Sequence, residues 1–340
     1  MQKKTYTVKD CLNIKHLFPH EYISSLAASV SEFLENEITE YRPAASDGNP
    51  GSLLEFKNNL PAIIVPDIHA RPYFLLNILK FPLPADFLFD KSASFNVEQA
   101  LEKKLVNVIC VGDSIHTELT VDRWYCIEEE FKKNIITGPF MKAEMKDCLS
   151  ALAGLMNLKL LYPENFHFLK GNHENILNEN EGGDFAFRKY ADEGYMVRRF
   201  ISEYYGDDVL YLISCWEKAL PLVAVGSNYV VSHAEPLKAY SREKLIDARS
   251  YPEVVNGLIW TRNGDVKTNT AREIMKNLLA PEKAADSFYF AGHRPVYENY
   301  ALRQDGHFIQ IHNPYRQNIA LVSNTKTFNP ESDIVGVDYE

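Results

Sequence analysis

The chain has 340 residues, of which 46% are hydrophobic and 24% are charged, and its formal net charge is −10. This length suits one large α/β domain or two smaller ones, and the composition is ordinary for a soluble globular protein. No apolar run is long enough to span a bilayer, the polar first residues lack the hydrophobic core of a secretion signal, and the acidic balance argues against a dedicated nucleic-acid binder. The five scattered cysteines show no C-x-x-C spacing, which is typical of reduced thiols, so we expect a cytoplasmic protein.

Helix and strand patterns alternate along the chain. Apolar residues at three- and four-residue steps predict one or two amphipathic helices over residues 10–40, followed by a loop rich in Pro, Gly and Ser. The later elements predicted by the same criteria are, in order, a strand before Asp67, a helix over 73–81, a strand before Asp113, helices across 124–160 with a break at 137–140, a strand before Asn172, helices across about 185–219, two strands around the turn at 226–228, a helix near 270–280, and a strand before His293. This alternation indicates a layered α/β architecture.

Five of the predicted strands end in residues that can bind a metal. They are followed by Asp67 and His69, by Asp113 and His116, by Asn172 and His173, by His233, and by His293. Imidazole, carboxylate and amide oxygen ligands suit Mn, Fe or Zn better than a thiolate site does. A carboxylate such as Asp113 can bridge two cations, and two-metal sites are common in phosphoryl transfer, where a metal-activated hydroxide attacks. A histidine beside a ligand, as His173 is beside Asn172, is well placed to protonate the leaving oxygen.

Taken together, these motifs resemble the signature of a known superfamily. The pattern D-x-H, G-D-x-x-[DH], G-N-H-[DE], H, G-H is that of the calcineurin-like metallophosphoesterases, and here it reads PDIHA, GDSIHTE, GNHEN, SHAEP and AGHRP. The segment from KYADEGYMVRRF to SHAEP and the element LIWTR are most similar to the serine/threonine phosphoprotein phosphatase branch. The resemblance covers about residues 60–320. It implies an α/β (α+β layered) fold, with a central β-sandwich of two mixed sheets flanked by helices.

The resemblance also implies roles for individual residues. The first metal would be held by Asp67, His69 and Asp113, and the second by the bridging Asp113 with Asn172, His233 and His293. His173 would be the general acid, and Arg262 a catalytic residue that clamps the phosphate. The implied activity is hydrolysis of phosphate monoesters, on phosphoserine and phosphothreonine proteins or on a small phosphate ester, by attack of a metal-bridging hydroxide. The implied cofactors are two metal ions, Mn, Fe or Zn.

The second motif departs from the phosphatase branch, where it runs G-D-x-V-D-R-G. His116 and Thr117 replace the Asp and the Arg. A neutral imidazole at His116 can accept a hydrogen bond from His173, so we keep His116 as a catalytic candidate. The missing guanidinium leaves the phosphate clamp one cation short, and the residues that could replace it are Arg71, Arg123 and Arg294.

Three smaller features accompany these motifs. Ala70 and Ala234 stand where the branch has glycines, and Glu235 lies close to the site with no assigned role. His312, on a predicted strand near the C-terminus, is interpreted as a core-edge histidine in preference to a further ligand.

Segments outside the motifs complete the expected organisation. We expect a helical N-terminal extension over 1–60, a catalytic domain over 61–325 and a C-terminal tail over 326–340. A helical insertion near 119–145 is either a solvated hairpin on the rim or a cap that restricts the substrate. The apolar helix face of the extension packs on the domain or on a second subunit, which leaves a homo-oligomer open.

Two alternative functions remain open. A nucleotide hydrolase, such as one that cleaves diadenosine tetraphosphate, shares the same motif set. A metal-binding scaffold weakened in catalysis is the non-enzymatic alternative, although retention of His173 beside all the ligands argues against it. A nuclease is disfavoured by the acidic balance and by the absence of a basic stripe. The expected partners are therefore a phosphorylated protein or a small phosphate ester, with no nucleic acid and no membrane.

Overall fold

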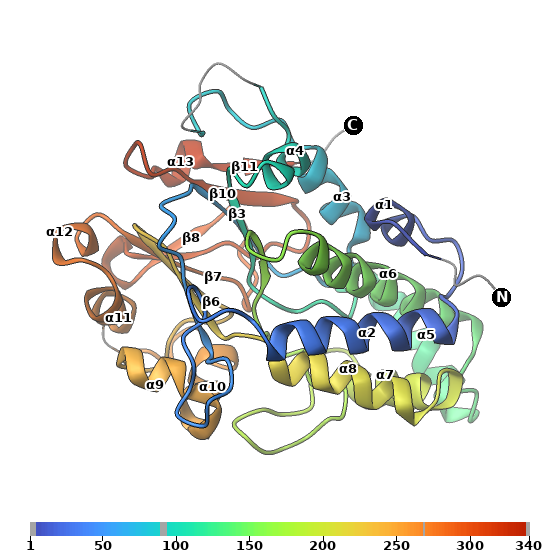
Figure 1. Ribbon diagram of the computed structural model, residues 1–340. Helices are drawn as coiled ribbons and strands as arrows, with labels where there is room; N and C mark the ends of the chain where they lie inside the picture. Colours follow the sequence, from blue (N-terminus) through green and yellow to red (C-terminus); the bar gives the residue numbers. More distant parts are fainter. Residues whose placement is uncertain (1–4, 89–93, 268, 338–340) are drawn as a thin grey trace.

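Several central strands bury both of their faces, which explains their unbroken apolar sequences. In the strand β2 (Ala62–Val65), Ile63 and Val65 pack against helices, whereas Ala62 and Ile64 face a second sheet. This period-two division makes each sheet the inner layer of a sandwich with helices outside. The computed structural model describes residues 5–88, 94–267 and 269–337, and Figure 1 shows the sheets lying between two groups of helices.

Each sheet of the sandwich contains neighbouring parallel strands. The first sheet has the order β11 (Ile334–Gly336), β10 (Asn318–Val322), β2 (Ala62–Val65), β3 (Asn107–Cys110), β4 (Phe166–Phe168). The second sheet has the order β1 (Leu53–Glu55), β5 (Val223–Val225), β6 (Tyr229–Ser232), β7 (Phe288–Ala291), β9 (Phe308–Gln310), β8 (Ala301–Arg303). Strands β2, β3 and β4 are mutually parallel, as are β6, β7 and β9. Their carboxyl ends therefore lie along one edge of each sheet.

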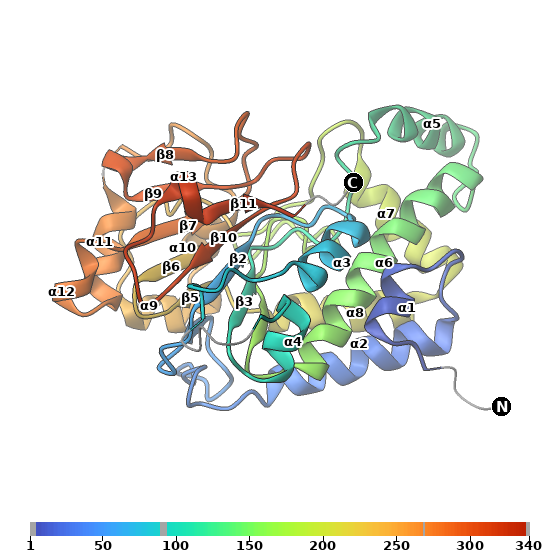
Figure 2. The same ribbon diagram turned by 90° about the horizontal axis from the view of Figure 1, so that it is seen from above.

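The helices cover the two outer faces unequally, as Figures 1 and 2 show from two directions. The larger group packs on the first sheet and comprises α1 (Val8–Leu12), α2 (His20–Glu35), α3 (Pro72–Lys80), α4 (Val97–Glu102), α5 (Val121–Lys132), α6 (Pro139–Leu161), α7 (Glu193–Tyr204) and α8 (Asp207–Ala219). The smaller group packs on the second sheet and comprises α9 (Arg242–Ile246), the 3-10 turn η1 (Ala248–Ser250), α10 (Pro252–Ile259), α11 (Thr270–Leu278) and α12 (Pro281–Ala284). The remaining short elements are η2 (Gln304–Gly306) and α13 (Pro330–Asp333).

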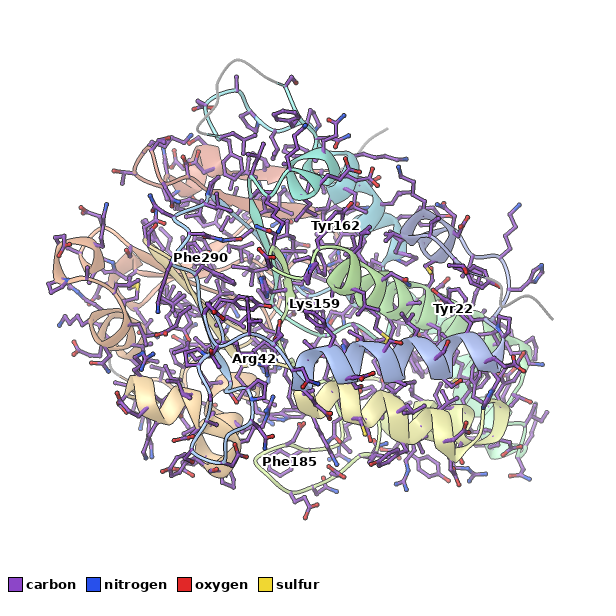
Figure 3. All side chains as sticks on the ribbon, viewed as in Figure 1. Tyr22, Arg42, Lys159, Tyr162, Phe185 and Phe290 are labelled. Carbon is purple, nitrogen blue, oxygen red and sulfur yellow. The ribbon has the colours of Figure 1, made fainter. Side chains whose placement is uncertain are left out.

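A buried group of charges ties the N-terminal segment to the rest of the fold (Figure 3). The Arg42 guanidinium donates to the Glu37 carboxylate at 2.5 Å and to the Ala219 carbonyl at the end of α8 at 2.6 Å. Lys159 of α6 lies 2.5 Å from the other Glu37 oxygen. The side chains of Glu37 and Arg42 are 1% and 0% exposed, so this network fixes the segment after α2 against α6 and α8.

The predicted fold, a central β-sandwich of two mixed sheets flanked by helices, is confirmed. One local prediction is wrong: the helical region predicted for 185–219 begins only at Glu193, because the Glu193 carboxylate accepts the backbone N–H groups of Lys189, Tyr190 and Ala191 and so holds them in a loop.

The terminal segments contribute to the sheets as well as flanking them. The predicted extension over 1–60 supplies strand β1, and the predicted tail over 326–340 supplies β11. Residues 1–4 and 338–340 of these segments lie outside the described residues. Among the residues that the structure describes, no helix has both the length and the apolar character needed to cross a membrane.

Candidate functional site

The predicted metal ligands come together where the parallel strands of both sheets end. Asp67, Asp113 and Asn172 follow β2, β3 and β4 of the first sheet, while His233 and His293 follow β6 and β7 of the second. The register brings these ends side by side, because Val65 pairs with Cys110 and Cys110 pairs with Phe168. The carboxyl edge of an α/β sheet is the usual place for chemistry, and here two such edges meet.

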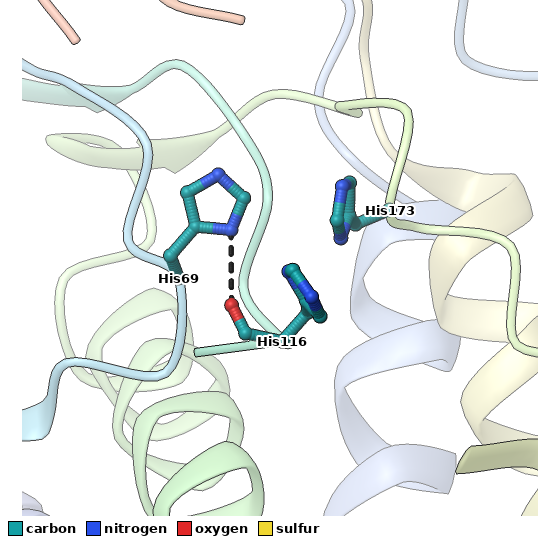
Figure 4. Close-up of side chains that lie close together, drawn as sticks. All are labelled: His69, His116 and His173. Atoms are coloured by element: carbon teal, nitrogen blue, oxygen red, sulfur yellow. Dashed lines mark hydrogen bonds between the residues drawn. The ribbon is translucent and has the colours of Figure 1, made fainter. Parts of the chain in front are cut away.

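The residues predicted for the first metal surround His69. Its Nδ1 lies 3.1 Å from the backbone carbonyl oxygen of His116 (Figure 4), so that nitrogen carries the proton and Nε2 presents a lone pair. The Nε2 atom lies 3.5 Å from Asp113 Oδ2 and 3.9 Å from Asp67 Oδ2. Three acceptor atoms therefore converge within a buried pocket.

The residues predicted for the second metal show the same arrangement. His233 Nδ1 lies 3.1 Å from the Val111 carbonyl oxygen, which leaves Nε2 as an acceptor 2.9 Å from Asn172 Oδ1 and 3.6 Å from Asp113 Oδ1. His293 Nδ1 lies 2.9 Å from the same Asn172 oxygen. Two acceptors at such a distance repel each other unless a cation lies between them. Asp113 faces both sets, as the predicted bridging role requires.

Burial gives these groups the electrostatics of a cation site. Desolvation raises the pKa of Asp67 and of Asp113, and it lowers the pKa of His233 to about 3. Among the described residues, Asp67 Oδ1 and His293 Nε2 have no hydrogen-bond partner although they are buried. Buried carboxylates beside neutral imidazoles are stabilised when a divalent cation binds to them. We call the side-chain atoms of the six predicted ligands that could bind such a cation the donor set. The residues therefore fit the predicted metals.

His173 lies beside these ligands rather than among them. Its backbone N–H donates to Asp113 Oδ1 at 2.9 Å, and its Nε2 lies 3.8 Å from Asp113 Oδ2. The ring stacks on Phe187, with ring centroids 4.3 Å apart, and burial lowers the pKa of His173 well below its usual value. Figure 4 shows His69, His116 and His173 facing one another. His173 is thus fixed at the edge of the donor set.

His116 lies in a fully buried position with an acidic neighbour. Its Nε2 is 3.5 Å from Glu193 Oε1, and its ring centroid is 5.0 Å from that of His173. Burial raises the pKa of Glu193, but the interaction with His116 and three backbone N–H donors outweigh it, so the pKa is lowered overall. A carboxylate therefore faces His116 from α7, a long way along the chain from the second motif.

Two of the predicted phosphate-binding arginines line the cavity above the ligands. Arg262 and Arg294 line this open cavity of about 560 Å³, together with His173 and with four of the predicted metal ligands, His69, Asp113, Asn172 and His293. Arg188 and Lys189 line it too, and the sequence pattern did not single them out. Their only signal is a pair of adjacent basic residues in the segment between the third and fourth motifs.

The other two candidate arginines are committed elsewhere. The Arg71 guanidinium donates to backbone carbonyl oxygens, among them those of Asp67 at 2.6 Å and Asn313 at 3.2 Å. Arg123 is paired with Glu144 at 3.0 Å and Asp147 at 2.9 Å. Both line a smaller cavity of about 270 Å³ beside His69, outside the cavity with the ligands. We therefore do not retain Arg71 as a phosphate ligand.

Glu235, which had no role in the sequence, has a structural one. Its buried carboxylate accepts from Arg303 at 2.7 Å and from Gln304 at 2.8 Å. It holds strand β8 and the following turn in place, because Arg303 ends β8 and Gln304 begins η2.

His312 and Glu118 lie at the site although neither was predicted to. His312 follows β9, and its ring is fully buried between Asp67 Oδ2, 3.4 Å from Nδ1, and Glu118 Oε2, 2.8 Å from Nε2. Glu118 Oε1 lies 3.6 Å from His69 Nε2 and also pairs with Lys189. For His312 the available signal was a position shortly after a strand, as for His233.

Comparison with known proteins supports the two-sheet sandwich at the level of the fold. No protein-family model matches the sequence, and no curated protein matches it significantly. A solved serine/threonine phosphatase from Saccharomyces cerevisiae, with similarity to human phosphatase PP5, matches with a TM-score of 0.58 and 13% identity, covering 94% of this chain and 89% of that chain. A cold-active protein-tyrosine phosphatase of a psychrophile Shewanella sp. gives a TM-score of 0.43 and 14% identity over 80% of this chain and 77% of its own. The chain therefore has a phosphatase-like fold, and the first of these structures carries that conclusion.

Proposed function

We propose that the protein is a metal-dependent phosphoesterase that hydrolyses phosphate monoesters in the manner of a serine/threonine phosphatase. The observation that carries the proposal is the convergence of acceptor atoms around Asp113, with His69 Nε2 and His233 Nε2 at 3.5 and 3.6 Å from its two oxygens. Such an arrangement is unfavourable without bound cations and suits a carboxylate shared by two of them. The phosphatase-like fold supports the same reading.

The residues that would hold the metals are divided between the two sheets. Asp67 and His69 would hold one ion, Asn172, His233 and His293 the other, and Asp113 would contribute to both. When bound, the ions would neutralise phosphate charge and make a water molecule acidic enough to serve as the nucleophile at neutral pH. The nitrogens of His69 and His233 that donate to backbone carbonyls hold each ring in the tautomer that such binding needs.

Proton delivery to the leaving oxygen is assigned to His173. Phe187 fixes the plane of its ring, and the backbone N–H bond to Asp113 fixes its distance from the ligands. His116 lies beside it, and Glu193 stands behind His116 at 3.5 Å. In this proposal a His116–Glu193 pair takes the orienting role that an Asp has in the phosphatase branch.

Binding of the phosphate is assigned to the cations that line the larger cavity. Arg262 and Arg294 were candidates in the sequence, and we add Arg188 as the guanidinium that replaces the one missing at Thr117. Guanidinium groups suit this role because they bind phosphate oxygens in a bidentate manner. The cavity is open, which is compatible with a phosphorylated side chain on a protein as well as with a small ester. The cytoplasmic location and a homo-oligomer stay predictions.

The experiment is phosphate release from a phosphoserine peptide by chelator-treated protein to which Mn²⁺ is returned. We expect metal-dependent turnover, and we expect His173→Asn to reduce kcat by about 10²- to 10⁴-fold, which is the usual contribution of a general acid. His167→Asn is the matched control, since this buried histidine contacts Lys159 away from the cavity. Absence of turnover on the peptide, with turnover on diadenosine tetraphosphate, would replace the phosphatase with the nucleotide hydrolase. Absence of both despite bound Mn²⁺ would leave the metal-binding scaffold.

A further inference from the structure

His312 repeats a pattern seen in the predicted histidine ligands His69 and His233. In each of those rings one nitrogen faces a hydrogen-bond acceptor outside the donor set, and the other faces the buried carboxylates. His312 does the same, because Nε2 lies 2.8 Å from the Glu118 carboxylate and Nδ1 points to Asp67. A metal-binding histidine almost always donates its second ring N–H to a carboxylate or a carbonyl.

The position of His312 Nδ1 is the second observation. The atom is fully buried and has no hydrogen-bond partner among the described residues. It lies 3.4 Å from Asp67 Oδ2, and single donor atoms of Asp67, His69 and His312 all fall within 4.8 Å of one another. Donor atoms about 2.1 Å from a shared ion lie about 3.0–3.5 Å apart when neighbouring, so the spacing from His312 to Asp67 is that of two ligands.

The placement follows from the sheet topology. His312 lies two residues beyond Gln310, the last residue of β9, and β9 runs parallel to β7, the strand that leads to His293. The second sheet therefore delivers three histidines to the shared edge, His233, His293 and His312, opposite the Asp and Asn residues of the first sheet. The His312 ring presents Nδ1 to Asp67 Oδ2, whereas the His293 ring presents Nδ1 to Asn172 Oδ1.

We propose that His312 is a further ligand of the metal assigned to Asp67, His69 and Asp113, and that Glu118 is the carboxylate that orients it. This inference rests on the proposed metal site. It gives the first metal a fourth protein ligand, in addition to the three implied by resemblance to the phosphatase branch. Lys189, which pairs with Glu118, completes the chain of contacts from the ligand to the rim of the cavity.

The rival explanation is that His312 is an imidazolium bridging the carboxylates of Asp67 and Glu118, with no metal-binding role. The two explanations predict different effects on metal binding when the imidazole of His312 is removed. Loss of a ligand weakens metal binding, whereas loss of a neighbouring positive charge leaves metal binding unchanged or makes it tighter.

The test measures Mn²⁺ binding directly, by elemental analysis after dialysis and by competition with a chelator, independently of turnover. We expect His312→Gln to lower the affinity of one Mn²⁺ by at least about tenfold, or to lose that ion, while the other stays bound. The matched control is His167→Gln, which removes a buried histidine outside the site. Binding of Mn²⁺ by His312→Gln as tightly as by wild type, or more tightly, would overturn the proposal.

A second variant keeps the test decisive should His312→Gln fail to fold. Glu118→Gln retains the imidazole and removes the charge that orients it, and we expect about a tenfold weaker affinity for the same ion. Glu235→Gln is its control, because Glu235 is also buried and paired with a cation, Arg303. Equal losses in the two variants would refute a specific role for Glu118 and with it the proposed ligand. A wild type that binds two Mn²⁺ ions but shows no turnover would refute the proposed function alone.

Discussion

Among the described residues, Glu37 is the only carboxylate paired with the buried cations Arg42 and Lys159, and replacing it with glutamine removes that charge. Arg42 and Lys159 both lie 2.5 Å from Glu37, on different oxygens, and their side chains are 0% and 6% exposed. The substitution leaves two buried positive charges without their partner, which typically costs about 3–5 kcal/mol. We therefore expect Glu37→Gln to lower the free energy of unfolding near neutral pH by about that amount.

The pH dependence of this loss follows from the pKa of Glu37. Burial alone raises this pKa, but Lys159 and Arg42 outweigh it and lower it from 4.5 to about 2. A depressed folded-state pKa stabilises the protein above the unfolded value, and the contribution disappears as the pH falls from about 4.5 towards 2. The difference corresponds to about 3 kcal/mol, which is of the same order as the cost of removing the charge. The difference in the free energy of unfolding between wild type and Glu37→Gln should therefore become smaller over that acid range.

The assay is urea unfolding followed by circular dichroism at a series of pH values between about 7 and about 3. Glu129→Gln is the control, because Glu129 is an exposed partner of Lys132 and its loss should cost less than about 1 kcal/mol at any pH. The pKa of the buried His167 is lowered to about 3 by burial and by Lys159 and is raised by Glu37, so loss of Glu37 lowers this pKa further. Above about pH 3 the ring is neutral in both folded proteins, and its acid dependence cancels from the comparison. If the free energies of unfolding of wild type and Glu37→Gln differ by the same amount at every pH, including below about pH 4.5, the reasoning is refuted.

Three further changes probe the site. Glu193→Gln removes the carboxylate next to His116. We expect kcat to fall by about 10- to 100-fold with the Mn²⁺ content unchanged, because a charged hydrogen-bond partner contributes about 1.5–3 kcal/mol. An unchanged kcat would contradict the proposed His116–Glu193 pair. Gly292→Ala would place a Cβ 1.9 Å from Asp67 Oδ1, so Mn²⁺ affinity should fall at least about tenfold, and wild-type affinity would show that Asp67 is not a ligand. Ala70→Gly relieves a left-handed backbone at φ 50°, and thermal unfolding should show no loss and up to about 1 kcal/mol of gain; a clear loss would mean that the methyl group packs usefully.

The predicted metal ligands were recognisable in the sequence because each one follows a short apolar strand, and this combination recurs five times along the chain. Ile63 and Val65 pack on one face of their sheet, and Ala62 and Ile64 pack on the other. The strand before Asp67 is therefore apolar at every position, and such a run is recognisable in the sequence. The sandwich followed from the family resemblance, and the order of strands within each sheet was not predicted. That order decides which side chains meet at the shared edge.

His312 shows why part of the site was missed. Its strand, β9, lies beside β7 only in the folded sheet, and nothing in the neighbouring sequence indicates that its ring faces Asp67. The same limit applies to Arg71, whose partners include carbonyl oxygens near Asn313, far along the chain. Local patterns identify a residue type at a strand end, whereas the partner of that residue depends on the topology.

The backbone of the site supports the functional reading independently of the side chains. His69, Asp113, His116 and His293 all have left-handed φ values, of 43°, 54°, 76° and 62°. Such a conformation costs a non-glycine residue about 1–2 kcal/mol, and it persists where the surrounding structure holds it. The holding contacts are specific, for the Asp113 N–H donates to the buried carboxylate of Glu174 at 2.9 Å and the His293 N–H donates to Asp67 at 2.9 Å. The four residues lie close together: His69 Nε2 is 3.5 Å from Asp113 Oδ2, His293 Nδ1 is 2.9 Å from Asn172 Oδ1, and the His116 ring centroid is 5.0 Å from that of His173. Four strained residues gathered in one place are hard to explain by packing alone. They are expected if the fold is selected to hold those side chains in one arrangement for a bound ion.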